Sequence, residues 1–249
     1  MPVARFRFYE ELNDFLPGPR RKRAFAHRCA REATVKHAIE ALGVPHTEVE
    51  LILVNGESVD FGHRVREGDR ISVYPKFESF DVSPLLRVRE RPLRRPRFIA
   101  DAHLGGLCKY LRMLGLDTLS GHGLSDAGIV SVAAREGRIV LTRDRDLLMH
   151  RAVTHGCYLR ARKPREQLVE VLSRLDLYRH ATPFTRCMRC NGLLSPVAKE
   201  RIAHGLPPRT DSFYDRFWAC RGCGKVYWQG SHYNKMEQFV DELLSSRNG

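Results

Sequence analysis

Three observations on the sequence predict an α/β protein of three parts. Residues 97–180 alternate short apolar runs with helical spacing, a pattern typical of a mainly parallel sheet covered by helices. Residues 1–80 hold several short strand patterns around one helix pattern. Residues 181–249 contain two Cys-x-x-Cys pairs at metal-ligand spacing. The length of 249 residues exceeds the usual size of one domain and agrees with this division.

The composition is that of a globular and strongly basic protein. Hydrophobic residues make up 43% and charged residues 29% of the chain. No run approaches the roughly 20 apolar residues that span a bilayer. No apolar segment follows Met1, so we expect no secretory signal and a cytoplasmic location. The net charge of +13 suits a polyanion, and nucleic acid is favoured over a membrane because no basic amphipathic helix stands out.

Residues 1–80 predict a small mixed domain. In order, we expect a strand over 3–9, its hairpin partner over 23–29, a helix over 34–42 between a Thr34 cap and a Gly43 stop, and strands over 49–54 and 70–74. Asn55-Gly56 is a turn signal after the third strand. This order resembles a ubiquitin-like β-grasp domain.

Two stretches of this domain, Val54-Asn-Gly-Glu-Ser-Val59 and Gly68-Asp-Arg-Ile-Ser-Val-Tyr-Pro75, resemble the sulfur carriers of thiamine and molybdopterin synthesis. Those carriers end in a free Gly-Gly, whereas this chain continues beyond Pro75. Sulfur transfer is therefore excluded, and we expect a docking or RNA-contact module. Within the run Arg20–Arg23, Arg21 and Lys22 are candidate RNA contacts; the alternative is a solvated loop.

Residues 81–96 predict a basic linker stiffened by prolines. Arg94 and Arg95 belong to an arginine-rich run that has few acidic residues near it in the sequence. Such a run is either solvated or holds a phosphate backbone, and we interpret Arg94 and Arg95 as RNA contacts.

Acidic residues follow two predicted strands of the region 97–180 and open one helix. The strand over 97–100 is followed by Asp101, and the strand over 139–141 by Asp144 and Asp146. Asp126 begins an apolar helix that stops at Gly137. In open α/β sheets, ligands collect at the carboxyl ends of strands.

Carboxylates gathered at one place repel each other unless a cation or proton lies between them. Hard cations such as magnesium take carboxylate, phosphate and water oxygens. A single acid of this kind is equally well explained as a helix cap. Four acids in a chain this basic favour a metal site.

Several separated motifs support a family resemblance: Phe98-Ile-Ala-Asp101-Ala-His, Asp126-Ala-Gly-Ile-Val, Gly137-Arg-Ile-Val-Leu-Thr-Arg-Asp144-Arg-Asp146, Cys187-Met-Arg-Cys190-Asn and Cys220-Arg-Gly-Cys223-Gly-Lys-Val-Tyr-Trp. In this order they resemble the Mut-seven C-terminal RNase domain family, which is similar to the PIN-domain nucleases. The resemblance covers residues 97–240.

The resemblance implies a metal-dependent endoribonuclease with one or two magnesium or manganese ions among Asp101, Asp126, Asp144 and Asp146. The usual PIN pattern also has a Glu on an early helix. No clear equivalent exists here, and Asp117 is a candidate replacement. The alternative is a non-catalytic RNA- or ribosome-binding factor that keeps a PIN-like fold. We expect a structured RNA such as transfer or ribosomal RNA, and the sequence leaves the oligomeric state open.

Basic residues flank the acids. Arg112, Arg143 and Arg145 either neutralise the acids or bind RNA, and we interpret them as RNA contacts. Arg143 and Arg145 are the stronger candidates because they adjoin two of the acids.

The C-terminal cysteines predict one structural zinc ion bound by Cys187, Cys190, Cys220 and Cys223 in a ribbon, with an insertion around residues 201–214. Disulfides or redox-active pairs are the alternatives. Trp228 and His232 follow the second pair. They either pack the ribbon or contact RNA, where Trp228 or His232 would stack on an unpaired base.

Overall fold

The computed structural model describes residues 1–75, 87, 96–202 and 213–245. The chain forms two compact units: Met1–Asp101 with Gly123–Arg160, and Ala102–His122 with Ala161–Gly249. This division differs from the expected domain boundaries, which stay a prediction. Within the described residues, no helix combines the length and apolar character needed to cross a membrane.

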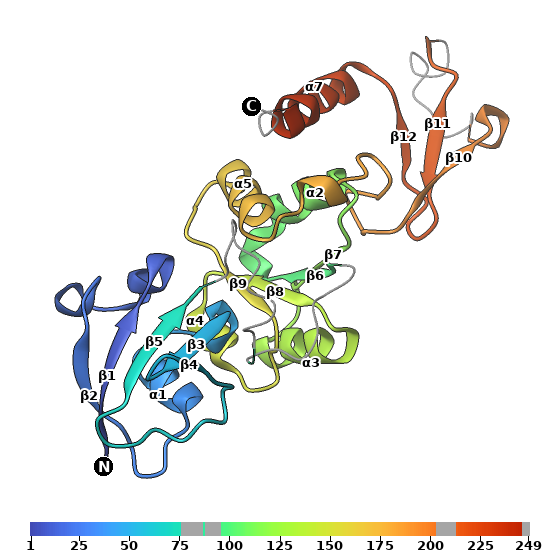
Figure 1. Cartoon of the computed structure of the whole chain (residues 1–249). Coiled ribbons are helices and arrows are strands. Elements are labelled where there is room, and N and C mark those ends of the chain that lie inside the picture. Colours follow the sequence, from blue (N-terminus) through green and yellow to red (C-terminus); the bar gives the residue numbers. More distant parts are fainter. Residues whose placement is uncertain (76–86, 88–95, 203–212, 246–249) are drawn as a thin grey trace. The chain divides into compact units, whose positions relative to one another are not determined.

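The N-terminal sheet of the first unit has the strand order β2-β1-β5-β3-β4 (Figure 1). Its elements are β1 (Val3–Phe8), β2 (Phe25–Arg28), helix α1 (Val35–Ala41), β3 (Leu51–Val54), β4 (Glu57–Ser58) and β5 (Arg70–Tyr74), with 3₁₀ helices at Glu10–Phe15, Gly18–Arg20 and His46–Glu48. Strands β1 and β5 are parallel, and the other neighbours are antiparallel. Phe6, Ile39 and Ile52 are among the fully buried core residues. This arrangement confirms the β-grasp prediction.

The Asn55-Gly56 turn joins β3 to β4 as predicted. Val54 pairs with Glu57, so the loop has two residues, and both adopt left-handed backbone angles, with φ of 54° and 98°. This geometry matches the right-handed twist of the flanking strands and favours Asn-Gly.

The helix predicted after Thr34 is confirmed as α1, because the Thr34 hydroxyl accepts a hydrogen bond from the backbone N–H of His37.

The first unit also contains the parallel strands β6 (Phe98–Ala100), β8 (Ile139–Thr142) and β9 (Gly156–Tyr158), paired in the order β6-β8-β9. Every residue of β6 and β8 is buried, as expected for strands covered on both faces. Helices α3 (Asp126–Glu136) and α4 (Arg145–Met149) belong to this unit. Helix α4 ends at Met149, because the next residue, His150, is extended.

The β-grasp domain is bonded to β9, the last strand of this order. The buried Glu48 carboxylate accepts a hydrogen bond from the backbone N–H of Tyr158 at 2.6 Å. His46 Nε2 lies 2.8 Å from the carbonyl oxygen of Val153 and Nδ1 lies 2.7 Å from Glu40. The Tyr158 side chain packs against the β-grasp core. The N-terminal domain and these strands are therefore one folded body.

The second unit contains α2 (Gly105–Met113), β7 (Thr118–Ser120), α5 (Pro164–Arg174), the strands β10 (Leu194–Val197), β11 (Phe217–Cys220) and β12 (Val226–Trp228), and α7 (Ser231–Ser245), with 3₁₀ helices at Ala102–Leu104, Tyr178–His180 and Lys199–Arg201. The last three strands form an antiparallel sheet in the order β10-β11-β12. Gly115 ends α2 with φ of 79°, and a Cβ there would lie 2.2 Å from the carbonyl oxygen of Thr182. Only glycine fits this close approach.

Candidate active site and metal centre

Three of the predicted acids are linked at the carboxyl ends of β6 and β8. The Thr142 hydroxyl donates a hydrogen bond to Asp101 Oδ2 at 2.8 Å and accepts one from the backbone N–H of Asp144 at 3.0 Å. Asp144 Oδ1 in turn accepts from the backbone N–H of Asp146 at 2.9 Å. Thr142 is fully buried, whereas Asp144 and Asp146 are exposed. The parallel register therefore brings distant acids to one edge, with Thr142 between them.

Asp126 begins α3, directly after Ser125, whose hydroxyl caps the helix by accepting from the backbone N–H of Gly128. The Asp126 side chain is exposed. A first-turn acid here interacts favourably with the helix dipole.

The described residues do not bring the aspartates together as tightly as a loaded metal site would. Among them, Cys187, Cys190, Cys220 and Cys223 are the one group of three or more candidate ligands whose atoms all lie within 4.8 Å. Electrostatic repulsion separates carboxylates that have no cation between them. The convergence of Asp101, Asp126, Asp144 and Asp146 on one ion thus stays a prediction.

Arg143 and Arg145, which adjoin Asp144 and Asp146 in the sequence, are exposed, as RNA contacts must be. The Arg145 guanidinium lies 5.2 Å from the ring centre of Phe15 and 5.9 Å from that of Tyr158. Phe15 belongs to the β-grasp domain, so this domain contributes a ring that contacts Arg145. Arg143 projects from the loop between β8 and α4.

Arg112 requires a correction. Its side chain is buried and donates hydrogen bonds from Nε to the Thr118 carbonyl and from Nη1 to the carbonyls of Met188 and Arg189. A guanidinium whose donors are used inside the fold does not present a surface to RNA. Arg112 instead attaches α2 to the first cysteine loop.

Asp117 also serves the fold of the second unit. Its carboxylate accepts from Asn191 Nδ2 at 2.8 Å and from Arg186 Nη2 at 3.4 Å. The Asn191 side-chain oxygen accepts a hydrogen bond from the backbone N–H of Thr118 at 3.0 Å. These contacts give Asp117 a structural role, and its use as a replacement for the early Glu stays a prediction.

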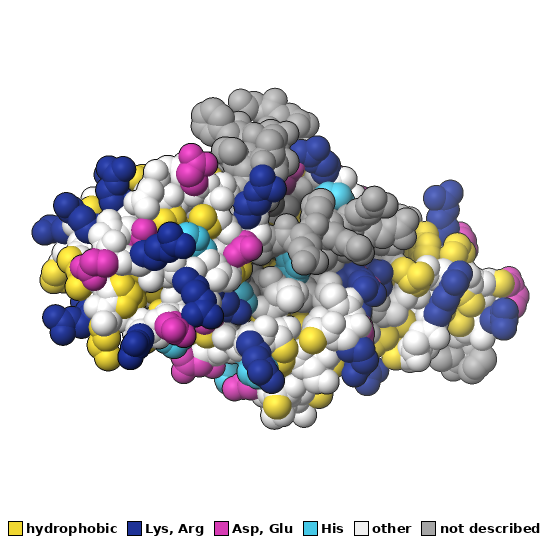
Figure 2. All heavy atoms as spheres, turned by 60° about the horizontal axis from the view of Figure 1, so that its bottom comes forward, with side chains coloured by type: hydrophobic (Ala, Val, Ile, Leu, Met, Phe, Trp, Pro, Cys, Tyr) yellow, Lys and Arg dark blue, Asp and Glu magenta, His cyan; other side chains and the backbone are white. Residues whose placement is uncertain are grey.

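Of the other predicted RNA contacts in the N-terminal domain and the linker, the structure describes Arg21 and Lys22 but not Arg94 and Arg95. Arg21 is exposed but donates from Nε to the Leu16 carbonyl, and the Lys22 backbone N–H donates to Asn13, so both positions also shape their loop. Arg94 and Arg95 lie outside the described residues. On the face in Figure 2, lysine and arginine side chains are spread widely among fewer acidic ones.

The four ribbon cysteines form a compact cluster. The sulfur atoms of Cys187 and Cys223 are 3.7 Å apart, and those of Cys190 and Cys220 are 3.3 Å apart. A tetrahedral zinc ion with Zn–S bonds near 2.3 Å places its sulfurs about 3.8 Å apart. A disulfide requires sulfurs about 2.05 Å apart, so the geometry fits thiolate ligation and not a disulfide.

Hydrogen-bond donors around Cys187 and Cys220 suit ionised thiols. The backbone N–H groups of Gly222 and Cys223 donate to the Cys220 sulfur at 3.3 and 3.5 Å. A Cβ on Gly192 would lie 2.8 Å from that sulfur, so this position needs glycine. Burial opposes ionisation of Cys187, but a hydrogen bond from the Tyr227 hydroxyl and others from backbone amides outweigh it and lower the thiol pKa to about 6. Burial and the neighbouring thiols raise the pKa of Cys190 to about 12.

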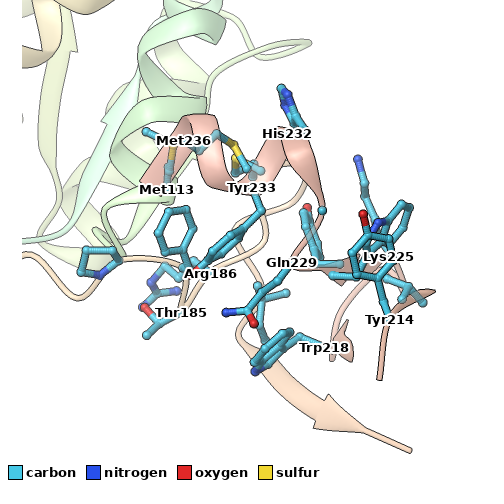
Figure 3. Close-up of a pocket in the computed structure, with 18 of the residues that line it drawn as sticks. Met113, Thr185, Arg186, Tyr214, Trp218, Lys225, Gln229, His232, Tyr233 and Met236 are labelled. Carbon is cyan, nitrogen blue, oxygen red and sulfur yellow. The ribbon is translucent and has the colours of Figure 1, made fainter. Parts of the chain in front are cut away.

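Trp228 and His232 line a cavity in the second unit (Figure 3). Trp228 is half-buried, and His232 is exposed at the start of α7. The sequence pattern did not indicate the cavity, because its wall also includes Phe184 and Tyr233, which lie far apart along the chain. Thr142 and Asn191 were missed as well, although both adjoin predicted site residues in the sequence.

Residues 96–240, more than half of the chain, match the model of the family described as the Mut7-C RNAse domain. The chain belongs to this family. Residues 1–81 match the family described as Mut7-C ubiquitin, which agrees with the β-grasp fold of the N-terminal domain. The Mut7-C domain thus includes the strand-end acids and the cysteine ribbon.

A curated human relative named "Exonuclease mut-7 homolog" is 24% identical over 236 residues. The match covers 62% of this chain and 27% of the relative, so the chain matches only about a quarter of that protein's length. Two crystal structures of small archaeal modifier protein 1 of Haloferax volcanii are 18% identical and cover 31% of this chain. They cover 100% and 99% of the archaeal chain, with TM-scores of 0.26 and 0.25.

Proposed function

We propose that the chain is a metal-dependent endoribonuclease that hydrolyses RNA phosphodiester bonds with Asp101, Asp126, Asp144 and Asp146. The observation that carries the proposal is the link through Thr142, which joins the acid after β6 to the acids after β8. Membership of an RNAse domain family supports it. A structured RNA, cut in the cytoplasm, stays the predicted substrate.

The acids have the chemistry that a magnesium or manganese ion requires. Asp101 uses Oδ2 to accept from Thr142, and Asp144 uses Oδ1 to accept from Asp146. Each carboxylate therefore has a second oxygen for a cation, and hard divalent ions prefer such ligands. A bound ion would supply an activated water and stabilise the leaving oxygen.

The remaining roles belong to the side chains around the acids. Thr142 keeps the Asp101 and Asp144 carboxylates in register, because one hydroxyl bonds to both segments. Arg143 and Arg145 are exposed beside the acids and would hold the phosphate backbone. The +13 charge of the chain favours RNA association over a wide surface.

The test is cleavage of a labelled RNA by the purified full chain with added manganese or magnesium. Asp144→Asn should lower the rate at least about a hundredfold, since it removes a cation-binding charge next to the reacting phosphate. RNA affinity should stay the same or rise, because a charge that repels RNA is lost. Asp241→Asn, an exposed acid on α7, is the matched control and should cut normally. Cleavage by Asp144→Asn at the wild-type rate would reject the assignment.

The competing function is a non-catalytic RNA-binding factor. It is favoured by one observation: the aspartates of the described residues form no group of three with oxygens within 4.8 Å. It predicts tight, salt-sensitive RNA binding and no products at any manganese concentration. The same titration therefore decides between the two functions.

A further inference from the structure

A cavity of about 1000 Å³ lies in the second unit and is lined mainly by aromatic and methionine side chains (Figure 3). The aromatic and methionine members are Met113, Phe184, Met188, Phe213, Tyr214, Trp218, Tyr227, Trp228, Tyr233 and Met236. In Figure 3, Tyr233 and Arg186 lie on one side, Trp218 and Gln229 below, and Tyr214 and Lys225 opposite. The wall thus combines the ribbon sheet, the start of α7 and the end of α2.

Parts of this wall are held in place by bonds to the fold. The Tyr227 hydroxyl lies 3.1 Å from the Cys187 sulfur, so this ring is tied to the cysteine cluster. Arg186 donates to the carbonyls of Gly115 and Asn191 and to Asp117. The Phe184 and Tyr233 rings pack 4.7 Å apart. A preformed wall of this kind favours ligand binding, since little side-chain freedom is lost.

Other lining groups remain available to a ligand. Trp218 and Tyr214 are half-buried, and Phe213 is 76% exposed. Gln229, Ser231 and Thr185 add hydrogen-bonding groups at the cavity surface. Large exposed aromatic surface beside polar groups is typical of an interaction site.

The charge of the lining selects the class of ligand. No acidic residue is among the described residues that line the cavity, whereas Arg186, Lys225 and His232 are. The Lys225 ammonium lies 5.4 Å from the centre of the Tyr227 ring and forms no ion pair with a carboxylate of the described residues. An aromatic surface beside a cation suits a planar base attached to a phosphate.

We propose that this cavity binds unpaired bases of a single-stranded RNA segment, which stack on Trp218 and Trp228 while Lys225 contacts the backbone. The inference rests on the proposed function in that it takes RNA as the substrate. Ligand sites of about 300–1,000 Å³ enclose drug-sized molecules, so the cavity has room for more than one base. Bases in a duplex are paired and stacked and cannot enter it.

The chain supplies its own probe for a direct test. It contains two tryptophans, and both line the cavity. The probe is an oligoadenylate of about eight nucleotides, within the usual length bound by single-strand sites. It is added to the zinc-loaded full chain carrying Asp144→Asn, which leaves the cavity unchanged. Tryptophan fluorescence should be quenched saturably by the single strand and much less by the same strand annealed to its complement.

Variants connect the signal to the residues. Trp218→Leu should weaken binding at least about fivefold, as expected for the loss of one base stack, while Trp218→Phe keeps an aromatic face and most of the affinity. Leu193→Ala is the matched control, because Leu193 is 48% exposed in the same region and does not line the cavity. Bound zinc, measured for each variant, verifies that the ribbon is folded. The quenching of the parent protein needs no variant, so it stays decisive if Trp218→Leu does not fold.

Each outcome separates the two proposals. Quenching by the single strand supports the cavity assignment even if the wild-type chain cuts no RNA, a result that would reject only hydrolysis. RNA cleavage without quenching, or equal quenching by the duplex, would overturn the cavity assignment and leave hydrolysis standing. Quenching by a peptide but by no oligonucleotide would overturn it too.

Discussion

At the scale of single residues, Thr142 decides how the candidate site is arranged. Its hydroxyl is both donor and acceptor, and it bonds to Asp101 and to the Asp144 backbone at once. The residue is the last of β8 and is fully buried, so its χ1 angle is restricted by packing and by its β-branch. Thr142 is therefore a positioning residue for the acids on each side.

Thr142→Val keeps the shape and removes the hydroxyl. We expect a loss of about 1–3 kcal/mol in the free energy of unfolding, because buried partners lose a hydrogen bond. The turnover number should fall more than tenfold with little change in KM, since the acids are misplaced but the RNA contacts remain. Urea unfolding and initial cleavage rates measure the two effects.

Thr142→Ser restores the hydroxyl without the methyl group and should recover most of the rate. If Thr142→Val and Thr142→Ser cut equally fast, the hydroxyl does not position the acids.

At the scale of elements, the cysteine ribbon is small and carries a four-cysteine site that could hold an ion. Its three strands β10, β11 and β12 are short, and only Phe217 and Cys220 of them are buried. A sheet this small buries too little apolar surface to be stable alone. Ligation of an ion by four thiolates would supply the missing stability, as in structural zinc sites.

We expect one zinc ion per chain and its loss in Cys190→Ser. Removal of zinc by a strong chelator should unfold the ribbon and shift the emission of Trp218 and Trp228 to longer wavelength, because both would become more exposed. The secondary structure of the β-grasp domain should persist, since its core contains none of the four ligands. Metal analysis and fluorescence measure this.

Cys29→Ser, which changes a buried cysteine of the β-grasp core, is the control and should keep the zinc. An unchanged zinc content in Cys190→Ser would contradict the four-ligand site.

At the scale of the whole molecule, the β-grasp domain covers one edge of the parallel strands. Tyr158 N–H would be an unpaired donor on the edge of β9, but it donates to the Glu48 carboxylate, whose side chain is 0% exposed. Arg160 donates from Nε to Asp14 and from Nη2 to the carbonyl of Glu11. Covered edges resist pairing with other chains. This domain is thus part of the folded body and not a detachable carrier.

Glu48→Ala should destabilise the first unit by about 2–3 kcal/mol, because a charged acceptor is removed from a buried donor. The Tyr158 amide should also exchange with solvent faster, since it loses its acceptor. Hydrogen exchange and urea unfolding check both effects.

The matched control is Glu57→Gln, an exposed acid of β4 in the same domain, which should change neither quantity. Unchanged protection of the Tyr158 amide in Glu48→Ala would show that the domains are joined in another way.

The sequence by itself determined the elements whose patterns are local. The Thr34 cap, the Asn55-Gly56 turn and the runs of β6 and β8 lie where spacing and turn chemistry predicted them. The short strands β4, β7 and β10–β12 were not predicted from local patterns.

Only the tertiary structure decided which polar groups share a partner. The sequence indicated Arg112 and Asp117 as site residues. Both form hydrogen bonds with groups about seventy positions away, and no local pattern reveals such partners. Trp218 and Tyr233 line one cavity for the same reason. Hydrogen bonding and packing depend on distance in space, whereas the sequence records only distance along the chain.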